Sequence, residues 1–473
     1  MSQIKETKKI PPREEMPVIM ADIRINTFDE VALGFSEEQA LVEASRCLQC
    51  KKPKCMESCP VNVDIPGFIN LIKQKEYQKA VDKIREKNCL PGICGRVCPQ
   101  EDLCEGACIQ GKKNQPVAIG ALQRFVADWE LNNGKGGPSI PGIKPTGKKV
   151  AVIGSGPAGL ATANDLALMG YQVTIMEALH IAGGVMVYGI PEYRLPNTII
   201  QQEIDYIKKL GVELKTNMVV GKTDSVNELL HDYDAVFVGA GAGLPWFMEI
   251  PGETLNGVYS SNEFLMRVNL MNGYRPDNDV APIHIGERVA IIGGGNVAMD
   301  CARTALRLGG KETNIIYRRS EVEMPACKEE LTQALEEGVK FTWLTSPIEV
   351  RGDENGWVKS IICRRYELGE PDASGRRRPI PIAGSEHEIE IDTVVMAIGQ
   401  GANMLFANDL PDLETSKNGN IAVDETTGKT SKPGIFAGGD IVTGAATVVQ
   451  AINGGRKAAR AINDYLMGCE ETN

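Results

Sequence analysis

Histidine, aromatic residues and long apolar segments are all scarce in this chain of 473 residues. The apolar runs near Val150 and Val289 stop well short of the about 18 residues that a transmembrane helix needs. The first residues, MSQIKETKKIPPREE, lack the apolar centre of a secretory signal. The 62 acidic residues outnumber the 51 basic ones, and the resulting net charge of -11 disfavours broad binding to nucleic acid or to an anionic membrane. We therefore expect a cytoplasmic protein that binds neither.

The four histidines also limit the kinds of catalysis that the chain can support. His180, His231, His284 and His387 lie far apart, and no HExxH motif or triad-like grouping surrounds any of them. We expect no catalytic side chain among them. At about 150 residues per domain, the length predicts about three domains.

Cysteine, in contrast, is concentrated in one short segment from Cys47 to Cys108. Without an export signal, metal ligation is a better explanation for this crowding than disulfides. Two groups are visible, and each contains a Cys-Pro pair of the kind that closes ferredoxin-like runs, which favours two [4Fe-4S] clusters. A zinc module and a set of packed thiols are the alternatives. The first group is Cys47, Cys50, Cys55 and Cys59, and the second is Cys89, Cys94, Cys98, Cys104 and Cys108.

A glycine-rich turn follows a Gly-, Pro- and Lys-rich linker near residues 131–149. The apolar segment 150–153 predicts a strand, the motif GxGxxG comes next, and LATANDLALMG has helical spacing. A second strand, VTIME, ends in Glu177, whose carboxylate would accept hydrogen bonds from a ribose. This context predicts a dinucleotide site, and the family resemblance given below implies that its ligand is FAD. Its turn consists of Gly154, Ser155, Gly156, Pro157, Ala158 and Gly159.

The same pattern recurs in VAIIGGGNVAMDCARTALRLGG with the motif GxGxxA, but its second strand, TNIIY, is followed by two arginines in place of an acid. Guanidinium groups bind phosphate well, so Arg318 and Arg319 favour NADP(H) over NAD(H). A solvated arginine pair at a strand end is the alternative. The turn comprises Gly293, Gly294, Gly295, Asn296, Val297 and Ala298.

Two further glycine clusters, VFVGAGAG and VVMAIGQG, follow predicted strands and are interpreted as the closing turns of the two nucleotide units. We expect the first to contact FAD through Gly239, Ala240 and Gly241, and the second to contact NADP through Ala397, Ile398 and Gly399.

Near the end of the chain, GIFAGGDIVTGAATVVQAI predicts a strand followed by Asp440 and by a helix opening over Ala446 to Ala451. An Asp before a helix is often only an N-cap. The double-glycine context favours a flavin contact instead, with the helix N-terminus facing the N1 and O2 edge of the flavin. The residues expected at FAD here are Gly439, Asp440, Ala446, Thr447 and Val448.

The segments FDEVALGFSEEQALVEASRCLQC, CPVNVDIPGFI, CGRVCPQEDLCEGAC and PVAIGALQRFVADWE resemble one iron-sulfur domain. It is shared by glutamate synthase small subunits, dihydropyrimidine dehydrogenase and the large subunit of NADH-dependent reduced ferredoxin:NADP oxidoreductase. The motif GG-x3-YGIP-x2-RLP, from Gly183, extends the resemblance over nearly the whole chain. PPREEMP and GAGLPWFMEIPGETLNGVYSSNEFLMRVNLM are most similar to the ferredoxin:NADP type.

The resemblance implies interleaved cluster ligands. Cys47, Cys50, Cys55 and Cys108 would bind one cluster, and Cys59, Cys98, Cys104 and Gln123 the other. Cys89 and Cys94 would then be packed thiols. Several relatives have Glu where this chain has Gln123, which affects the potential of that cluster. The further FAD contacts that we expect are Ala178, Gly183, Gly184, Tyr188, Gly189, Ile190, Arg194, Leu195 and Val220.

The family's architecture implies an α/β fold in which two Rossmann-like dinucleotide-binding domains follow an α-helical iron-sulfur domain. We expect the clusters in 1–145, FAD in 146–280 and 391–473, and an inserted NADP(H) domain in 281–390. Hydride would pass directly between the cofactors, and no side chain would act as nucleophile or acid. No CxxC or Cx4C pair stands beside Gly183, which argues against a disulfide mechanism.

Electrons would be relayed to or from a second subunit that carries flavin or iron-sulfur centres, or ferredoxin. The favoured hypothesis is that the protein is part of an electron-bifurcating ferredoxin:NADP oxidoreductase. The alternatives are a glutamate synthase small subunit, the large subunit of a sulfide dehydrogenase, and a non-catalytic cluster scaffold.

Overall fold

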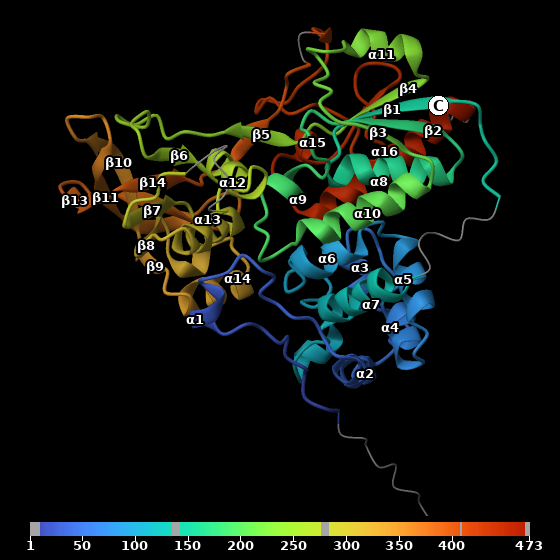
Figure 1. The fold of residues 1–473 in the computed structure, drawn as a ribbon, viewed down its shortest axis with the longest axis horizontal. Coiled ribbons are helices and arrows are strands. Elements are labelled where there is room, and N and C mark those ends of the chain that lie inside the picture. The colour runs from blue at the N-terminus through green and yellow to red at the C-terminus, as the bar shows by residue number, and fades with distance from the viewer. Residues whose placement is uncertain (1–9, 135–141, 276–282, 407–408, 469–473) are drawn as a thin grey trace, which may run out of the picture.

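The computed structural model describes residues 10–134, 142–275, 283–406 and 409–468. Its N-terminal part is helical and forms the blue and cyan body in Figure 1. Capping starts α2, where Ser36 and Gln39 form a reciprocal capping box, and Asp64 caps the first turn of α4. The helices are α1 (Ala21–Arg24), α2 (Glu37–Ser45), α3 (Lys54–Glu57), α4 (Ile65–Lys73), α5 (Tyr77–Arg85), α6 (Pro91–Val97), η1 (Ile109–Lys112) and α7 (Ile119–Asn133).

A parallel five-stranded sheet carries the first glycine turn. Its order is β16-β4-β1-β2-β3, so a strand from near the end of the chain lies at one edge. The strands are β1 (Lys149–Ile153), β2 (Gln172–Met176), β3 (Glu213–Lys215), β4 (Ala235–Val238) and β16 (Ile435–Ala437). β1, β4 and β16 read as continuous apolar runs, as buried parallel strands do.

Helices α8 (Pro157–Leu168), α10 (Asn197–Lys209) and α16 (Val448–Met467) lie between this sheet and the N-terminal helices (Figure 1). One hydrophobic core joins both parts, because Phe68 and Leu122 of the helical part and Leu160 and Ile452 of the sheet part belong to the same buried cluster. Shorter helices α9 (Val185–Tyr188), α11 (Val226–Asp232) and α15 (Asp440–Thr443) complete this unit.

A second parallel sheet has the order β6-β14-β7-β8-β9 and carries the second glycine turn. Its strands are β6 (Val258–Ser260), β7 (Arg288–Ile292), β8 (Glu312–Tyr317), β9 (Lys340–Trp343) and β14 (Thr393–Met396). The associated helices are α12 (Ser261–Asn269), α13 (Asn296–Arg307), η2 (Glu321–Glu323) and α14 (Lys328–Glu336).

Two antiparallel elements were not predicted from the sequence. One is a sheet of β10 (Thr345–Gly352), β11 (Val358–Pro371), β12 (Arg377–Pro381) and β13 (His387–Glu390) beside the second parallel sheet. The other is a ribbon in which β5 (Ala242–Pro245) pairs with β15 (Gln400–Ala402). The ribbon lies where the chain leaves the first sheet unit and where it returns.

The predicted fold class is confirmed, since two parallel sheets with strand-turn-helix motifs follow a helical domain. The strands named in the sequence occur as β1, β2, β4, β7, β8 and β14. The numerical domain boundaries stay predictions. Part of the linker, residues 135–141, and the boundary between 280 and 281 lie outside the described residues. Among the residues that are described, no helix has the length and apolarity to cross a membrane.

Candidate functional site

The first glycine turn is shaped by its backbone. Gly154 has φ +93°, and a Cβ there would lie 2.6 Å from the carbonyl oxygen of Gly239. A Cβ on Gly159 would overlap the carbonyl oxygen of Gly154, so α8 can approach the strand only without a side chain. A Cβ on Gly156 would meet no atom within 4 Å. This open space beside the N-terminus of α8 is where a pyrophosphate would be received.

Glu177 is held rigidly next to this turn. Its Oε2 accepts hydrogen bonds from the backbone N-H of Ser155 at 2.9 Å and from the Ser155 hydroxyl at 2.5 Å. Its Oε1 accepts from the backbone N-H of Leu179 at 2.8 Å, and the Ser155 hydroxyl accepts from the N-H of Gly183 at 2.9 Å. The turn, the end of β2 and the start of the GG-x3-YGIP segment are therefore fixed to one another.

Asp440 and Tyr188 join Glu177 at the same place. Burial, together with the nearby charges of Asp440 and Glu177, raises the pKa of Tyr188 to about 12. Burial also raises the pKa of Asp440 to about 6, although the backbone N-H of Ala446 donates to its carboxylate and opposes the rise. Glu177 and Tyr188, which are close in the sequence, thus lie near Asp440, which comes from the far side of the second sheet unit in the sequence.

The helix after Asp440 begins at Val448, two residues later than predicted, because Thr447 caps it in a capping box with Gln450. The helix then packs closely on α8. A Cβ on Gly455 would overlap the carbonyl oxygen of Ala158, and the Thr162 hydroxyl donates to the Gly455 carbonyl at 3.1 Å.

The second glycine turn repeats the design of the first. Gly293 has φ +143°, and a Cβ there would overlap the carbonyl oxygen of Ala397. A Cβ on Gly294 would lie 2.7 Å from the Tyr317 ring, whereas a Cβ on Gly295 would meet nothing within 4 Å. The space beside Gly295 therefore corresponds to the space beside Gly156. Asn296 opens α13, and its Oδ1 accepts a hydrogen bond from the N-H of Cys327 at 2.8 Å.

The two arginines at the end of β8 have different surroundings. Arg319 is buried; its Nε donates to the carbonyl of Arg377 at 2.8 Å, and it forms a 2.8 Å ion pair with Asp372. Arg318 is exposed and forms no ion pair with the described residues. The structure thus leaves Arg318 available for a phosphate and commits Arg319 to the loop between β11 and β12.

Arg194 has partners that the sequence did not indicate. Its NH1 donates to both carboxylate oxygens of Asp300 at 2.8 and 2.7 Å, and its Nε is 2.8 Å from Glu330. These partners belong to α13 and α14 of the second sheet unit, so Arg194 takes part in the contact between the units, and its expected contact with FAD stays a prediction. The other residues expected at FAD or NADP differ in their exposure. The buried ones are Leu195 and Val220, and the exposed ones are Ala178, Ala446, Val297 and Ile398. The half-buried ones are Gly184, Gly189, Ile190, Ala240, Gly241 and Val448.

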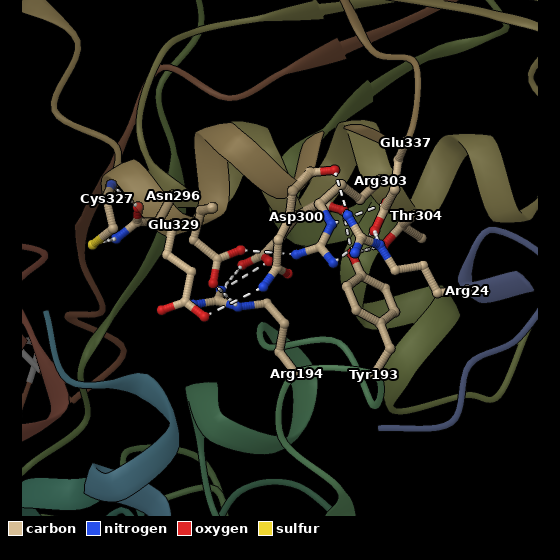
Figure 2. Close-up of polar contacts among 12 residues, drawn as sticks. Arg24, Tyr193, Arg194, Asn296, Asp300, Arg303, Thr304, Cys327, Glu329 and Glu337 are labelled. Carbon is tan, nitrogen blue, oxygen red and sulfur yellow. Dashed lines mark hydrogen bonds and ion pairs between the residues drawn. The ribbon is translucent and has the colours of Figure 1, made fainter. Parts of the chain in front are cut away.

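Figure 2 shows the network around Arg194, which sequence reasoning missed. Glu337 is fully buried and accepts hydrogen bonds from Arg303 at 3.0 and 2.9 Å, from Arg307 at 2.7 Å and from Arg24 at 2.8 Å. Burial opposes ionisation, but the hydrogen bonds from the arginines outweigh it and lower the pKa of Glu337 to about 2. Tyr193 donates to the carbonyl of Asp300 at 3.2 Å. The network joins the helical part, the first sheet unit and the second.

The cysteines line two hollows in the helical part. The first, with about 410 Å³ of empty space partly open to solvent, is lined by the four cysteines expected at one cluster: Cys47, Cys50, Cys55 and Cys108. Burial raises the pKa of Cys47, and it raises that of Cys55 to about 12. A metal centre would have to displace these thiol protons to bind.

The second hollow, of about 430 Å³, is lined by Cys59, Cys98, Cys104 and Gln123, and also by Cys94. The Gln123 Nε2 donates to the carbonyl of Pro91 at 3.0 Å. Cys89, which was expected to be a packed thiol, is buried and is not among the lining residues. In the described part of the chain, no three His, Cys, Asp or Glu side chains already form a group that could hold a metal ion.

Residues 24–135 match the family model of dihydropyrimidine dehydrogenase domain II, 4Fe-4S cluster, and residues 148–455 match that of pyridine nucleotide-disulphide oxidoreductase. The chain is 38% identical to the glutamate synthase [NADPH] small chain of Escherichia coli K12, and the match covers 96% of each protein.

It is also 44% identical to the NADP(+)-dependent formate dehydrogenase subunit beta of Moorella thermoacetica, over 87% of this chain. The chain spans only 60% of that relative's length. FprA from Mycobacterium tuberculosis, solved in complex with NADPH, has a TM-score of 0.58 at 22% identity. It covers 69% of this chain and 86% of its own, which shows a likeness of fold alone.

The chain belongs to the pyridine nucleotide-disulphide oxidoreductase family and carries an N-terminal 4Fe-4S domain of the dihydropyrimidine dehydrogenase type. It is an NADP(H)-dependent FAD and iron-sulfur oxidoreductase. The family match decides between the interpretations of the cysteine region in favour of iron-sulfur ligation over zinc.

Proposed function

We propose that this protein transfers hydride between NADP(H) and FAD and passes electrons one at a time through two [4Fe-4S] clusters to or from a partner. The observation that carries the proposal is the position of Val449. It lines the second cysteine hollow and lies in the first turn of α16, next to Thr447 and Val448 at the expected flavin edge. The flavin site and one cluster site thus share the start of one helix.

The residues present fit each cofactor. FAD would be held by the open turn at Gly156 and by Glu177, Tyr188 and Asp440, and NADP(H) by the turn at Gly295 with Arg318 at the 2'-phosphate. When bound, FAD exchanges an electron pair with the nicotinamide and single electrons with iron-sulfur clusters. The chain's own residues bind and orient these groups, and no side chain needs to supply a proton to the reacting atoms.

Each proposed set of cluster ligands consists of residues that line one hollow. Cys47, Cys50, Cys55 and Cys108 would hold the first cluster, and Cys59, Cys98, Cys104 and Gln123 the second. The Gln123 amide supports its role. Its Nε2 is engaged by the Pro91 carbonyl, so the amide oxygen is the atom left to serve as an iron ligand.

The order of the sites predicts where electrons leave. Ile65 and Ile119 line both hollows, so the two would-be clusters are neighbours, and the first lies farther from α16. Leu48 and Ile109 beside the first hollow are 51% and 40% exposed. Exposed lysines Lys51, Lys52 and Lys54 follow Cys50. A basic and apolar surface over the first cluster suits a partner with an acidic face.

The partner is proposed to be a second subunit with flavin or iron-sulfur centres, or ferredoxin, as in a ferredoxin:NADP oxidoreductase that splits electron pairs. A glutamate synthase small chain is the second candidate, favoured by the match over 96% of both this chain and the Escherichia coli relative. Both names, small chain and subunit beta, describe parts of larger enzymes.

Anaerobic analysis of the native complex tests the proposal. We expect iron, sulfide and FAD in the isolated protein, with faster bleaching of the flavin absorbance by NADPH than by NADH. A co-purifying subunit with FAD and a [2Fe-2S] centre would support the ferredoxin:NADP type, and one with FMN would support glutamate synthase. Colourless protein that contains zinc in place of iron would contradict the relay.

A further inference from the structure

The second cysteine hollow offers one more donor than a four-iron cluster requires. Its wall contains Cys59, Cys98 and Cys104, the amide of Gln123, and also the thiol of Cys94. A [4Fe-4S] cluster takes one protein ligand at each of its four irons. Under the function proposed above, one of these five side chains is therefore left over in a cluster that is otherwise fully ligated.

Cys94 lies in the wall of the same hollow as the other four donors. It lies on α6, and its side chain is 2% exposed. Its thiol donates to the Oδ1 of Asn88, which is also buried, at 3.7 Å, and it lines the hollow together with the expected ligand Cys98. A buried thiol that lines the same hollow as the ligand cysteines is placed to reach the same cluster.

Gln123 and Cys94 are also linked through one short helix. The carbonyl that orients the Gln123 amide belongs to Pro91, the first residue of α6, and Cys94 stands one turn further along. The amide oxygen of Gln123 is the weakest donor of the five, because it is neutral, whereas a thiolate is the usual ligand of iron-sulfur clusters.

We propose that Cys94 is a reserve ligand of the second cluster that takes the place of Gln123 at one iron. In this exchange the bond between iron and the amide oxygen breaks, the Cys94 thiol releases its proton to solvent, and a bond forms between iron and sulfur. No electron is gained or lost. The added negative charge at the cluster lowers its reduction potential.

Iron content and electron paramagnetic resonance of four variants test the proposal on the full-length protein, purified anaerobically with its FAD. Gln123→Ala is expected to keep the wild-type iron content, with a changed spectrum and a more negative potential for one cluster. Gln123→Ala combined with Cys94→Ala is expected to lose half of the iron. Cys94→Ala alone is expected to match the wild type, since Gln123 remains.

Cys89→Ala provides the matched control, because Cys89 is an equally buried thiol outside the hollow. Combined with Gln123→Ala, it should leave the iron content unchanged. Gln123→Leu repeats the test with a side chain that fills the same space, and retained FAD shows that each variant is folded.

Equal iron loss in Gln123→Ala with and without Cys94 would overturn the proposal, as would a three-iron signal in Gln123→Ala. Loss of half the iron in Cys94→Ala alone would also overturn it, because Cys94 would then be a resident ligand. Wild-type protein without iron or sulfide would instead refute the proposed function itself, before any variant is compared.

Discussion

The NH1 of Arg194 donates to both carboxylate oxygens of Asp300, at 2.8 and 2.7 Å, and this ion pair joins the first sheet unit to helix α13 of the second. The Asp300 side chain is 4% exposed and that of Arg194 is 12% exposed. Removing one partner of such a buried pair leaves the other charge without compensation. The pair is therefore well placed to hold the two nucleotide-binding units in a fixed relation.

Asp300→Asn is expected to lower the free energy of unfolding by about 3 kcal/mol, because the Arg194 guanidinium loses a charged partner in a buried setting. Denaturant titration followed by flavin fluorescence measures the loss, and hydrogen exchange should increase in α13. Glu263→Gln is the control, since it removes an exposed pair with Arg267 and should change stability by less than about 0.5 kcal/mol. Similar losses in both variants would contradict the role of the buried pair.

The coenzyme assignment depends on Arg318. Arg318→Ser should weaken NADPH binding by about tenfold to a hundredfold, the range expected for a lost charge-assisted hydrogen bond, and should leave NADH nearly unchanged. Arg319→Ser is the matched variant. It breaks the contact with Asp372 and should affect both coenzymes alike by disturbing the end of β8. Steady-state reduction with each coenzyme measures the effect, and an equal loss of both in Arg318→Ser would remove the basis for NADP(H).

Asp440 predicts a pH dependence of flavin binding. Burial raises its pKa to about 6, so the carboxylate becomes protonated as the pH falls below that value. An ionised carboxylate accepts hydrogen bonds from the ribityl hydroxyls better than a carboxylic acid does, so FAD affinity should fall by up to about tenfold between pH 8 and pH 5. Asp440→Asn should bind FAD more weakly at pH 8 and show little change with pH. Fluorescence titration of the apoprotein measures both, and a slope that persists in Asp440→Asn would assign the effect to another group.

The lysines beside the first cysteine hollow predict that the rate of electron transfer to the partner depends on salt. Reversing Lys51 and Lys52 to Glu should slow electron transfer to an acidic partner at low ionic strength by about tenfold, and added salt should reduce the difference. Reduction of the flavin by NADPH in single-turnover experiments should not change. The control variant reverses Lys311 and Lys340, which are exposed on the second sheet unit, to Glu and so changes the net charge by the same amount. If that control slows the partner equally, the surface beside Cys50 is not the docking site.

The glycine turns could be predicted because their geometry is local. Gly154 and Gly293 need a positive φ, and Gly159 needs a missing side chain within a few residues of the turn, so the sequence pattern carries the information. The crowding of the cysteines is equally local, but their division between the two hollows followed from the family resemblance, and it did not include Cys94. The start of α16 was misplaced by two residues because the capping box of Thr447 was not weighed.

The contacts that could not be predicted are those between residues that are distant in the sequence. Arg194 forms ion pairs with Asp300 and Glu330, and Arg319 forms one with Asp372. No short sequence motif predicts these contacts. Burial of a guanidinium can be inferred only when the opposing element is known. For the same reason the position of Cys94 in the second hollow followed from the packing of α6 on α7, and the sequence alone suggested only a packed thiol.

The placement of β16 at the edge of the first sheet bears on how the protein acquires its cofactors during synthesis. The cysteines that line the hollows and Gln123 are made before β1 emerges from the ribosome, whereas Asp440 and α16 are translated only after the whole second sheet unit. Domains generally fold as units in the order in which they are made. Cluster insertion can therefore begin on a nascent chain, but a complete flavin pocket can form only after the second sheet unit and α16 have also been made.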